Sequence, residues 1–518
     1  MQRFWMRIGL ALALVALVVG GLPVVPLPTT AAAQDERWVT DEIIAEFAAF
    51  VEGEMAYYHV PGVAVGIVEG DEVVHTQGFG VRNVETGDPF TPQTRFRIGS
   101  TTKSMTALLV AQLVDEGALD WDTPVVEILP DFQTAQPELT ALITVRDLMG
   151  MDTGLVSDQM TSLEWDAWTV DDLLAAIAVQ EIGGEYSEFF SYNNEVYATA
   201  GYVAAAAAGR EPTPASYTDL MQVRVFDPIG MTETSLTDDL STLGDNFARS
   251  YEFTLVSGIE TPVAAAPLPI GVLGPAGNTW STIDDMNRYL ITHLNGGVTP
   301  DGERIVSAET LAETYQPGVS MDVGLPGVED AAYGMGWVTE TYRDIPIRYH
   351  DGGWEGYRTQ MMIFPEANVG LVIFTNHVFG DVLNYALGYA FAEMLYDREP
   401  VVPHQSHAFF DDIYGSLDDV LAGLPSPYLE PDTVAPLVGE YEDGWQVWQR
   451  DDGTLWMERG SWQFLLYPLP LPHLYLVGNG SAFGMMIQFS VPEDAGEPVS
   501  AALLDEEMDP ALSFIKLD

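Results

Sequence analysis

Ser100 and Lys103, a serine and a lysine three residues apart, form the pattern with the clearest chemistry in the chain. Residues 101–116 carry an apolar stripe at helical spacing, so the pair is expected at the start of a central helix. A serine that opens a helix has a backbone N–H without a helical partner, and this group can bind an oxyanion. A lysine three positions later returns to the same face, where burial can remove its proton. The spacing therefore predicts a serine nucleophile with a lysine base.

A second copy of this spacing, Ser513 and Lys516, is interpreted as coincidence because no helix follows it. Lys103 and Lys516 are the only two lysines among 518 residues, and arginine supplies the remaining basic charge. Arginine cannot lose its proton and act as a base, so a lysine at position 103 indicates a function that arginine cannot perform. The alternative is a surface lysine on an amphipathic helix.

Tyr192 and Asn194 lie on a predicted loop that immediately precedes a helical run. Side chains two residues apart on a loop can face one cleft, where a phenol can relay a proton and a carboxamide can bind a substrate carbonyl. An ordinary loop tyrosine with a helix-capping asparagine is the alternative interpretation.

His350, Gly352 and Gly353 belong to a short motif predicted to end a strand and begin a turn. Glycines allow a substrate to approach the backbone, and the Gly353 N–H is a candidate second oxyanion donor. A simple turn after a strand is the alternative.

Taken in order, Ser-x-x-Lys, Tyr-x-Asn and His-x-Gly resemble the three motifs of serine β-lactamases and penicillin-binding proteins. The spacing is similar to that of class C β-lactamases, DD-carboxypeptidases, D-aminopeptidases and related esterases. The resemblance covers about residues 41–395, and further segments match it: Ile143–Leu148, Pro228–Met231, Pro275–Asn278 and Tyr333–Trp337. It implies Ser100 as nucleophile, Lys103 and Tyr192 as proton carriers, and Asn194, His350, Gly352 and Gly353 as substrate-binding residues. It implies neither a metal nor an organic cofactor.

Two departures from the family pattern concern the substrate. Asp351 occupies a position that is often threonine in proteins that bind β-lactams or D-alanyl peptides, and an acid there repels a substrate carboxylate. His350 replaces a lysine found in many β-lactamases, which removes an assured positive charge at neutral pH. Both changes argue against efficient β-lactam hydrolysis. Met151 and Asp152 also depart from a His-Thr-Ser-type segment, which we interpret as structural.

Elements from both ends of a main domain, residues 34–397, must position these motifs. A helix is expected at 41–57, strands at 63–68, 72–79, 345–350, 358–364 and 369–375, and a closing helix at 381–396. The helix-rich middle predicts a second lobe. The fold class is therefore α+β: an antiparallel sheet flanked by helices, with a helical lobe. A linker at 398–436 with one short helix near 411–424 leads to a small, antiparallel, barrel-like β-domain at 437–518, a looser match to the family.

Composition excludes several other classes of protein. The chain has no cysteine, which removes thiolate catalysis, disulfides and thiolate metal sites. Its formal charge of −57, with the acids scattered, argues against binding nucleic acid or anionic lipid. Arg3, Arg7, an apolar run at 8–19 and the small residues 31–33 predict a signal peptide at residues 1–33 and a secreted or periplasmic protein. An uncleaved membrane anchor is the alternative.

The sequence thus predicts an exported serine hydrolase that acts on esters, amides, D-amino-acid peptides or β-lactams through an acyl-enzyme, with a small molecule or peptide as its partner. One alternative is a non-catalytic, penicillin-binding-type sensor that keeps the fold. Another is a binding module centred on C-terminal aromatics such as Trp445 and Trp448.

Overall fold

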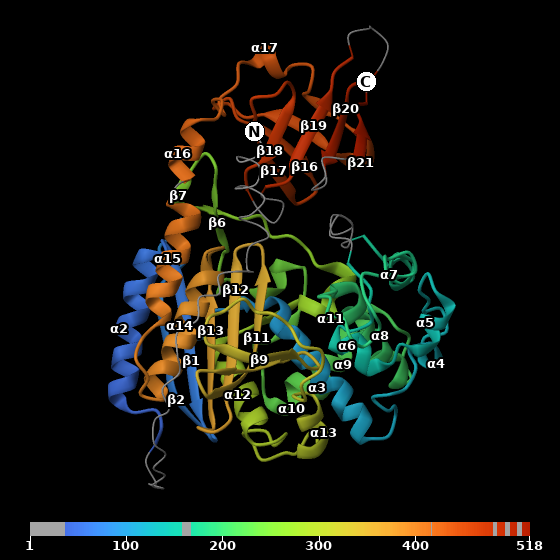
Figure 1. Ribbon diagram of the computed structural model, residues 1–518, viewed down its shortest axis with the longest axis vertical. Helices are drawn as coiled ribbons and strands as arrows, with labels where there is room; N and C mark the ends of the chain where they lie inside the picture. The colour runs from blue at the N-terminus through green and yellow to red at the C-terminus, as the bar shows by residue number, and fades with distance from the viewer. Residues whose placement is uncertain are drawn as a thin grey trace.

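The computed structural model describes residues 37–157, 167–415, 417–479, 484–492, 498–504 and 510–517. The predicted signal peptide, residues 1–33, lies outside the described residues. Figure 1 shows a larger part built around one sheet and a helical lobe, and a smaller sheet at the top of the view. We call these the main body (residues 37–397) and the C-terminal β-domain (residues 437–517).

Strands from both ends of the main body form a single antiparallel sheet. Its described strands have the order β3-β2-β1-β13-β12-β11-β10-β9. The first hairpin joins the late strands through β1 and β13, where Val63 lies opposite Thr375. This confirms the sheet predicted from early and late strands. The strands are β1 (Gly62–Glu69), β2 (Glu72–Asn83), β3 (Asp88–Pro89), β9 (Val328–Tyr333), β10 (Val338–Tyr342), β11 (Ile345–Trp354), β12 (Tyr357–Phe364) and β13 (Val369–Thr375).

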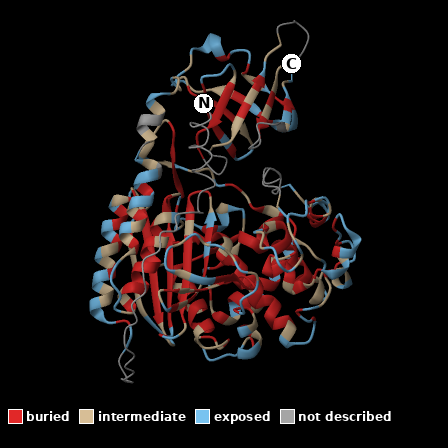
Figure 2. Ribbon diagram, viewed as in Figure 1, coloured by how far each residue is buried: buried red, intermediate tan, exposed pale blue. Residues whose placement is uncertain are grey.

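Helices cover both faces of this sheet (Figure 1). Helix α12 (Ile283–Leu294) packs so closely on one face that a Cβ at Gly66 would meet its side chains. Strand register places Met362 on the opposite face, where Gly388 of α14 (Gly380–Leu395) lies against it. Outside α14 lies α2 (Asp41–Tyr57), in agreement with the helix predicted there. Figure 2 shows the resulting burial of side chains: the sheet is buried, and the outer faces of the helices are exposed.

The helical lobe is built around α3 (Thr102–Asp115), which contacts α8 (Asn194–Ala207) and α11 (Gly274–Gly277). Both α3 and α8 are buried along most of their length, so the functional groups that they carry sit on a fixed support. The surrounding helices are α4 (Val125–Ile128), α5 (Pro137–Leu142), α6 (Val145–Gly150), α7 (Val170–Ile177), α9 (Pro214–Met221), α10 (Asp227–Ile229) and α13 (Ala308–Glu313).

Short strands connect the helical lobe to the rest of the main body. A small sheet has the order β4-β8-β5, and a separate hairpin pairs β6 with β7. The hairpin extends upward from the main body in Figure 1, beside the C-terminal β-domain. These strands are β4 (Phe96–Arg97), β5 (Ser235–Leu236), β6 (Tyr251–Thr254), β7 (Gly258–Ala264) and β8 (Thr279–Ser281).

The segment after the main body is more helical than the sequence indicated. It contains α15 (Val402–Tyr414), α16 (Leu417–Ala422) and α17 (Pro431–Val434), where the sequence predicted one short helix near 411–424. Pro403 lies in the first turn of α15, where its missing N–H removes no helical hydrogen bond. Pro403 is therefore compatible with the start of a helix, although the sequence predicted no helix at this point of the linker.

The C-terminal β-domain is an antiparallel meander in which each described strand pairs with the next, as predicted. Its core includes Trp445, which is 0% exposed. The strands are β14 (Gly439–Glu440), β15 (Gln446–Gln449), β16 (Leu455–Arg459), β17 (Trp462–Pro468), β18 (Leu474–Val477), β19 (Met486–Ser490), β20 (Ser500–Leu504) and β21 (Pro510–Ile515).

Candidate active site

Ser100 lies in a tight 3₁₀ turn, Gly99–Thr101, between β4 and α3. The turn begins with a left-handed residue, Gly99, whose φ is +53°, a conformation that glycine adopts without a Cβ penalty. A Cβ at Gly99 would lie 2.6 Å from the Gly353 nitrogen, so the turn rests directly on β11. The backbone nitrogens of Ser100 and Gly353 consequently lie in adjoining segments.

Strand β11 loses its β10 partner beside the Ser100 turn. Its pairing with β10 ends at Tyr349, whereas its pairing with β12 continues to Trp354. The strand thus runs past the predicted His350–Gly353 turn, and the turn occurs at Glu355, which has a positive φ. The prediction of a strand end at His350 was wrong, because the chain remains paired with β12 while the Ser100 turn replaces β10 as its neighbour.

Gly352 has a packing role that the sequence analysis missed. An ideal Cβ at this position would lie 2.0 Å from the Ile98 carbonyl oxygen and 3.0 Å from the Thr101 hydroxyl. Both contacts involve the segment that carries Ser100. Glycine is required here so that β11 and the nucleophile turn can approach each other, in addition to any approach by substrate.

We expect Gly352→Ala to destabilise the protein by about 1–3 kcal/mol and to lower activity, because the added methyl group displaces the Ser100 turn. Urea denaturation measures the stability change. Gly353→Ala is the matched control for stability, since its Cβ would lie 3.4 Å from the Arg358 side chain, an ordinary contact. Equal stability of the two variants would contradict this packing role.

The amine of Lys103 lies at the centre of the site. Its Nζ is 2.9 Å from the Ser100 Oγ, 2.8 Å from the Asn194 Oδ1 and 2.9 Å from the Ala276 carbonyl oxygen. The lysine is 0% exposed. Two of these acceptors, an amide oxygen and a carbonyl, cannot donate, so a neutral amine can donate to both and accept from Ser100. The geometry therefore suits both proton states of the amine.

Burial lowers the pKa of Lys103 to about 7, although the carboxylates of Asp351 and Glu195 act in the opposite direction. An amine with this pKa is substantially neutral at and above pH 7, whereas an ordinary lysine is charged. Lys103 can thus accept a proton from Ser100 under physiological conditions.

Tyr192 stands at the rim of the site, with its ring centroid 4.8 Å from the Lys103 Nζ. The side chain is 41% exposed, while protein encloses its hydroxyl end, near Ser100 and Asp351. Desolvation of the hydroxyl and the Asp351 carboxylate raise the pKa of Tyr192 well above its usual range. The phenol is therefore protonated at neutral pH and can donate a proton to a leaving group.

The loop that presents Tyr192 is held by backbone contacts to the segment after α6. The Ser187 N–H donates to the Asp152 carbonyl at 2.8 Å, and the Ser191 N–H donates to the Met151 carbonyl at 3.0 Å. These bonds support the structural interpretation of Met151 and Asp152. Asn193, rather than Asn194, caps α8 by accepting from the Val196 N–H, which leaves Asn194 free to bond Lys103.

His350 is buried and held on both ring nitrogens. Its Nδ1 lies 2.5 Å from the Asp351 carbonyl oxygen, which can only accept, so Nδ1 is the donor. Its Nε2 then accepts from the Tyr333 hydroxyl at 2.9 Å. Burial lowers the pKa of His350 to about 4, with Lys103 adding to this effect and Asp351 opposing it, so the imidazole is neutral at pH 7.

The structure also brings to the site two groups that the sequence analysis did not assign. The Ala276 carbonyl bonds Lys103, and the Tyr333 hydroxyl bonds His350. Both residues belong to segments that matched the family, Pro275–Asn278 and Tyr333–Trp337, so a signal was present. A backbone carbonyl has no residue-type signature, however, and its role becomes visible only in three dimensions.

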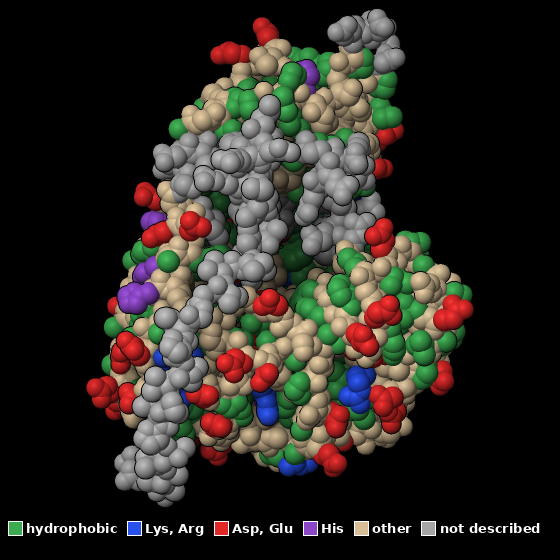
Figure 3. Space-filling view, in the orientation of Figure 1, with side chains coloured by type: hydrophobic (Ala, Val, Ile, Leu, Met, Phe, Trp, Pro, Cys, Tyr) green, Lys and Arg blue, Asp and Glu red, His purple; other side chains and the backbone are tan. Residues whose placement is uncertain are grey.

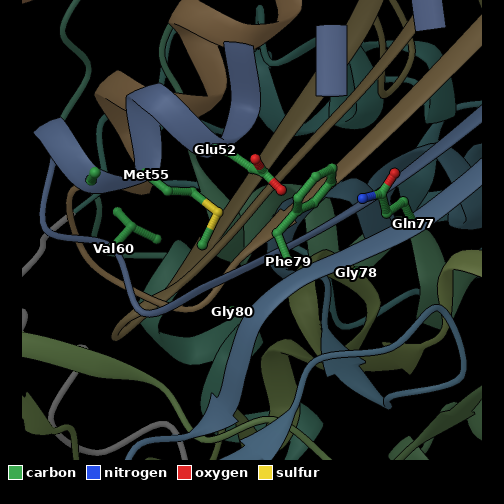
Figure 4. A pocket seen from close by; sticks show the side chains of 8 residues that line it. Glu52, Met55, Val60, Gln77, Gly78, Phe79 and Gly80 are labelled. Atoms are coloured by element: carbon green, nitrogen blue, oxygen red, sulfur yellow. The ribbon is translucent and has the colours of Figure 1, made fainter. Parts of the chain in front are cut away.

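Other candidate features lie apart from this site. In the second Ser-x-x-Lys copy, Lys516 donates to the carbonyl of Pro436, the residue just before the C-terminal β-domain. A cavity of about 420 Å³ lies between α2 and β2 and is lined by Met55, Phe79 and neighbouring residues. Figure 4 shows these side chains. The cavity lies four strands from β11 in the sheet.

Surface charge and metal-ligand geometry give two further findings. Figure 3 shows acidic side chains spread over the visible face of the described residues, with few basic ones. Among the described residues, no group of three or more His, Asp and Glu side chains is arranged to hold a metal ion. His407, which lies in the linker, has its Nε2 2.8 Å from the Glu54 carboxylate.

The fold thus places a candidate nucleophile, Ser100, beside a buried candidate base, Lys103. The family model for Beta-lactamase matches residues 47–391. Penicillin-binding protein 4 of Amycolatopsis lactamdurans is 30% identical over 397 residues, which cover 74% of this chain and 94% of that protein. An unguisins hydrolase of Aspergillus campestris is 25% identical over 455 residues, which cover 82% of this chain and 80% of the relative.

A solved structure has the same overall fold. The octameric penicillin-binding protein homologue from Pyrococcus abyssi has a TM-score of 0.58 and 20% identity, covering 91% of this chain and 100% of that one. This protein belongs to the beta-lactamase family, whose relatives here include penicillin-binding proteins and hydrolases. Membership supports serine hydrolase activity on amide or ester bonds.

Proposed function

We propose that this protein is an exported serine hydrolase that cleaves esters or amides through an acyl-enzyme on Ser100. The observation that carries this proposal is the buried Lys103 amine, 2.9 Å from the Ser100 hydroxyl and with a pKa lowered to about 7. A nucleophile and a base at hydrogen-bond distance, with the base held by further groups, are what acyl transfer to a serine requires.

In the first half-reaction, the Ser100 Oγ attacks the substrate carbonyl carbon while its proton passes to the Lys103 Nζ. We assign the N–H groups of Ser100 and Gly353, which lie in adjoining segments, to bind the oxyanion. The bond from carbon to the leaving group then breaks, and the leaving group takes a proton that Tyr192 relays from Lys103. The product of this step is an ester between the acyl group and Ser100.

In the second half-reaction, water attacks the acyl carbon and gives a proton to the Lys103 amine. The bond to Ser100 breaks, Oγ recovers the proton, and the acid departs. Asn194 keeps Lys103 in place through its Oδ1, and its amide hydrogens can donate to a substrate carbonyl. Both ring nitrogens of His350 bond protein groups, so we assign it the role of fixing the backbone from Asp351 to Gly353.

Asp351 narrows the class of substrate. Side chains alternate along β11, so Asp351 and Gly353 share its exposed face, while His350 and Gly352 are buried. The carboxylate is close enough to raise the pKa of both Lys103 and Tyr192, so it lies near these two groups. It repels a substrate carboxylate and attracts an ammonium group. We therefore propose neutral esters or amides, or D-amino-acid peptides bound through an amine, ahead of β-lactams.

We expect Asp351→Thr to reverse this charge preference. The kcat/KM for an activated ester that carries a carboxylate beside the scissile bond should rise about 10-fold, because one nearby repulsion of about 1.4 kcal/mol is removed. The kcat/KM for the matching ammonium ester should fall. Glu46→Gln is the control, since it removes the same charge from the exposed side of α2. If both variants behave alike, Asp351 does not select the substrate.

The proposal of export rests on the residues that form the predicted signal peptide, with the charged, apolar and small-residue order of secretory signals. None of the helices in the described part of the chain is long and apolar enough to span a bilayer. Sequencing the N-terminus of the protein recovered from culture medium tests the proposal: Gln34 as first residue supports it, and Met1 contradicts it.

Mass spectrometry of the intact protein separates the hydrolase from a non-catalytic sensor. A fluorophosphonate should add one label, which peptide mapping places on Ser100 and which Ser100→Ala prevents. An activated ester should then be turned over many times per labelled site. Stable acylation by a penicillin without turnover of any ester would instead favour the sensor, and a label on another serine would reject the assignment of Ser100.

A further inference from the structure

The backbone carbonyl of Leu268 joins two segments that lead to the two oxyanion donors. Its oxygen accepts from the Arg97 Nη1 at 2.6 Å and from the Trp354 Nε1 at 2.8 Å. Arg97 stands three residues before Ser100 in β4, and Trp354 immediately follows Gly353 in β11. These segments come from distant parts of the sequence, and this carbonyl holds both of them.

The side chain of Leu268 belongs to a different structural unit. It is 3% exposed and packs in the core of the C-terminal β-domain, with residues such as Leu437, Trp445 and Val477. The ring of Trp354 packs against the same core. The β-domain core thus fixes the side chain of Leu268, and the carbonyl of the same residue accepts hydrogen bonds from Arg97 and Trp354.

Further hydrogen bonds fix Arg97 in the main body and join the main body to the C-terminal β-domain. Arg97, 2% exposed, also pairs with Asp238 and bonds the Asn278 amide oxygen, each at 2.6 Å. On the other side, the Leu255 N–H donates to the Gly478 carbonyl of the β-domain at 3.0 Å. Arg97 is therefore fixed within the main body, and a backbone bond from the β6–β7 turn gives a second connection between the main body and the C-terminal β-domain.

We propose that the C-terminal β-domain sets the spacing of the oxyanion hole, with Leu268 and Trp354 as its positioning residues. An oxyanion donor contributes only within a narrow distance of the developing charge. A displacement of about 1 Å can cost on the order of 100-fold in rate. The proposal extends the proposed acyl transfer at Ser100 and rests on it, because it gives the β-domain a role in the chemical step.

Trp354→Phe tests this proposal in the full-length protein, because it keeps an aromatic ring against the β-domain core and beside the Arg97 guanidinium, and it removes the N–H that bonds Leu268. For a p-nitrophenyl ester, kcat should fall about 10-fold or more while KM changes little, since the oxyanion forms only after binding. Trp456→Phe is the matched control: it removes an indole N–H that bonds the Thr454 hydroxyl at 2.9 Å within the β-domain. The control should retain the kcat of the wild type.

Leu268→Ala is a second test, because it weakens the packing of residue 268 in the β-domain core and keeps the backbone carbonyl. The kcat of Leu268→Ala should fall with little change in KM. The double variant with Leu268→Ala and Trp354→Phe should lose less kcat than the product of the two single losses, because both changes act through one carbonyl. Three results would overturn this proposal without affecting the proposed function. They are an unchanged kcat in Trp354→Phe, an equal loss of kcat in Trp456→Phe, and a loss in the double variant equal to the product of the two single losses. A wild-type protein without Ser100-dependent turnover would overturn the proposed function as well.

Discussion

Lys103→Arg is expected to lower kcat/KM for an activated ester by about 10²–10⁴-fold, the usual contribution of a general base. A guanidinium does not lose its proton at any physiological pH, and its planar group does not reproduce the three bonds of a small amine. Stopped-assay kinetics over a range of enzyme concentrations would measure the loss.

Two variants make this result interpretable. Lys516→Arg changes the only other lysine, which is distant from Ser100 in sequence and bonds the Pro436 carbonyl, so it should leave kcat/KM unchanged. Lys103→Met keeps a similar apolar length without the amine and should match the loss of activity while remaining folded, as judged by circular dichroism. Activity near that of the wild type in Lys103→Arg would show that position 103 supplies no base.

Ser100→Ala is expected to have the largest effect of all, a loss in kcat on the order of 10⁶-fold, as for removal of a nucleophilic serine elsewhere. The backbone N–H of residue 100 remains, so the oxyanion can still be bound and only the covalent route is lost. Ser100 is half-buried and its hydroxyl accepts a hydrogen bond from Lys103 near the surface of the site, so the thermal unfolding midpoint should change little. An active Ser100→Ala variant would reassign the nucleophile.

Local patterns predicted much of the fold. The periodicity of residues 41–57 and the apolar runs of the sheet specify α2 and strands such as β1 and β13 almost residue by residue. These elements follow from local burial patterns, which a sequence displays directly. The strand after His350 could not be placed in this way, because its continuation to Trp354 follows from pairing with β12, the next strand in the chain.

Spacing predicted which residues meet in the site, but not how each one acts. Ser-x-x-Lys specifies two groups one helical turn apart, and the structure places them 2.9 Å from each other. Asn194 and Gly352 were assigned to the substrate, yet Asn194 bonds Lys103 and Gly352 makes room for the nucleophile turn. The contact between Arg97 and Leu268 spans 171 positions, and no local pattern reports such a distance.

The central claim is that the Lys103 amine is neutral near physiological pH, and it can be measured directly because the chain has two lysines. Lysine labelled with ¹³C at Cε gives one NMR signal per residue, and Lys516→Arg leaves that of Lys103 alone. Its chemical shift, followed from pH 5 upward under conditions where the protein stays folded, should titrate with a midpoint near 7. A midpoint near 10, the ordinary value for lysine, would contradict the account.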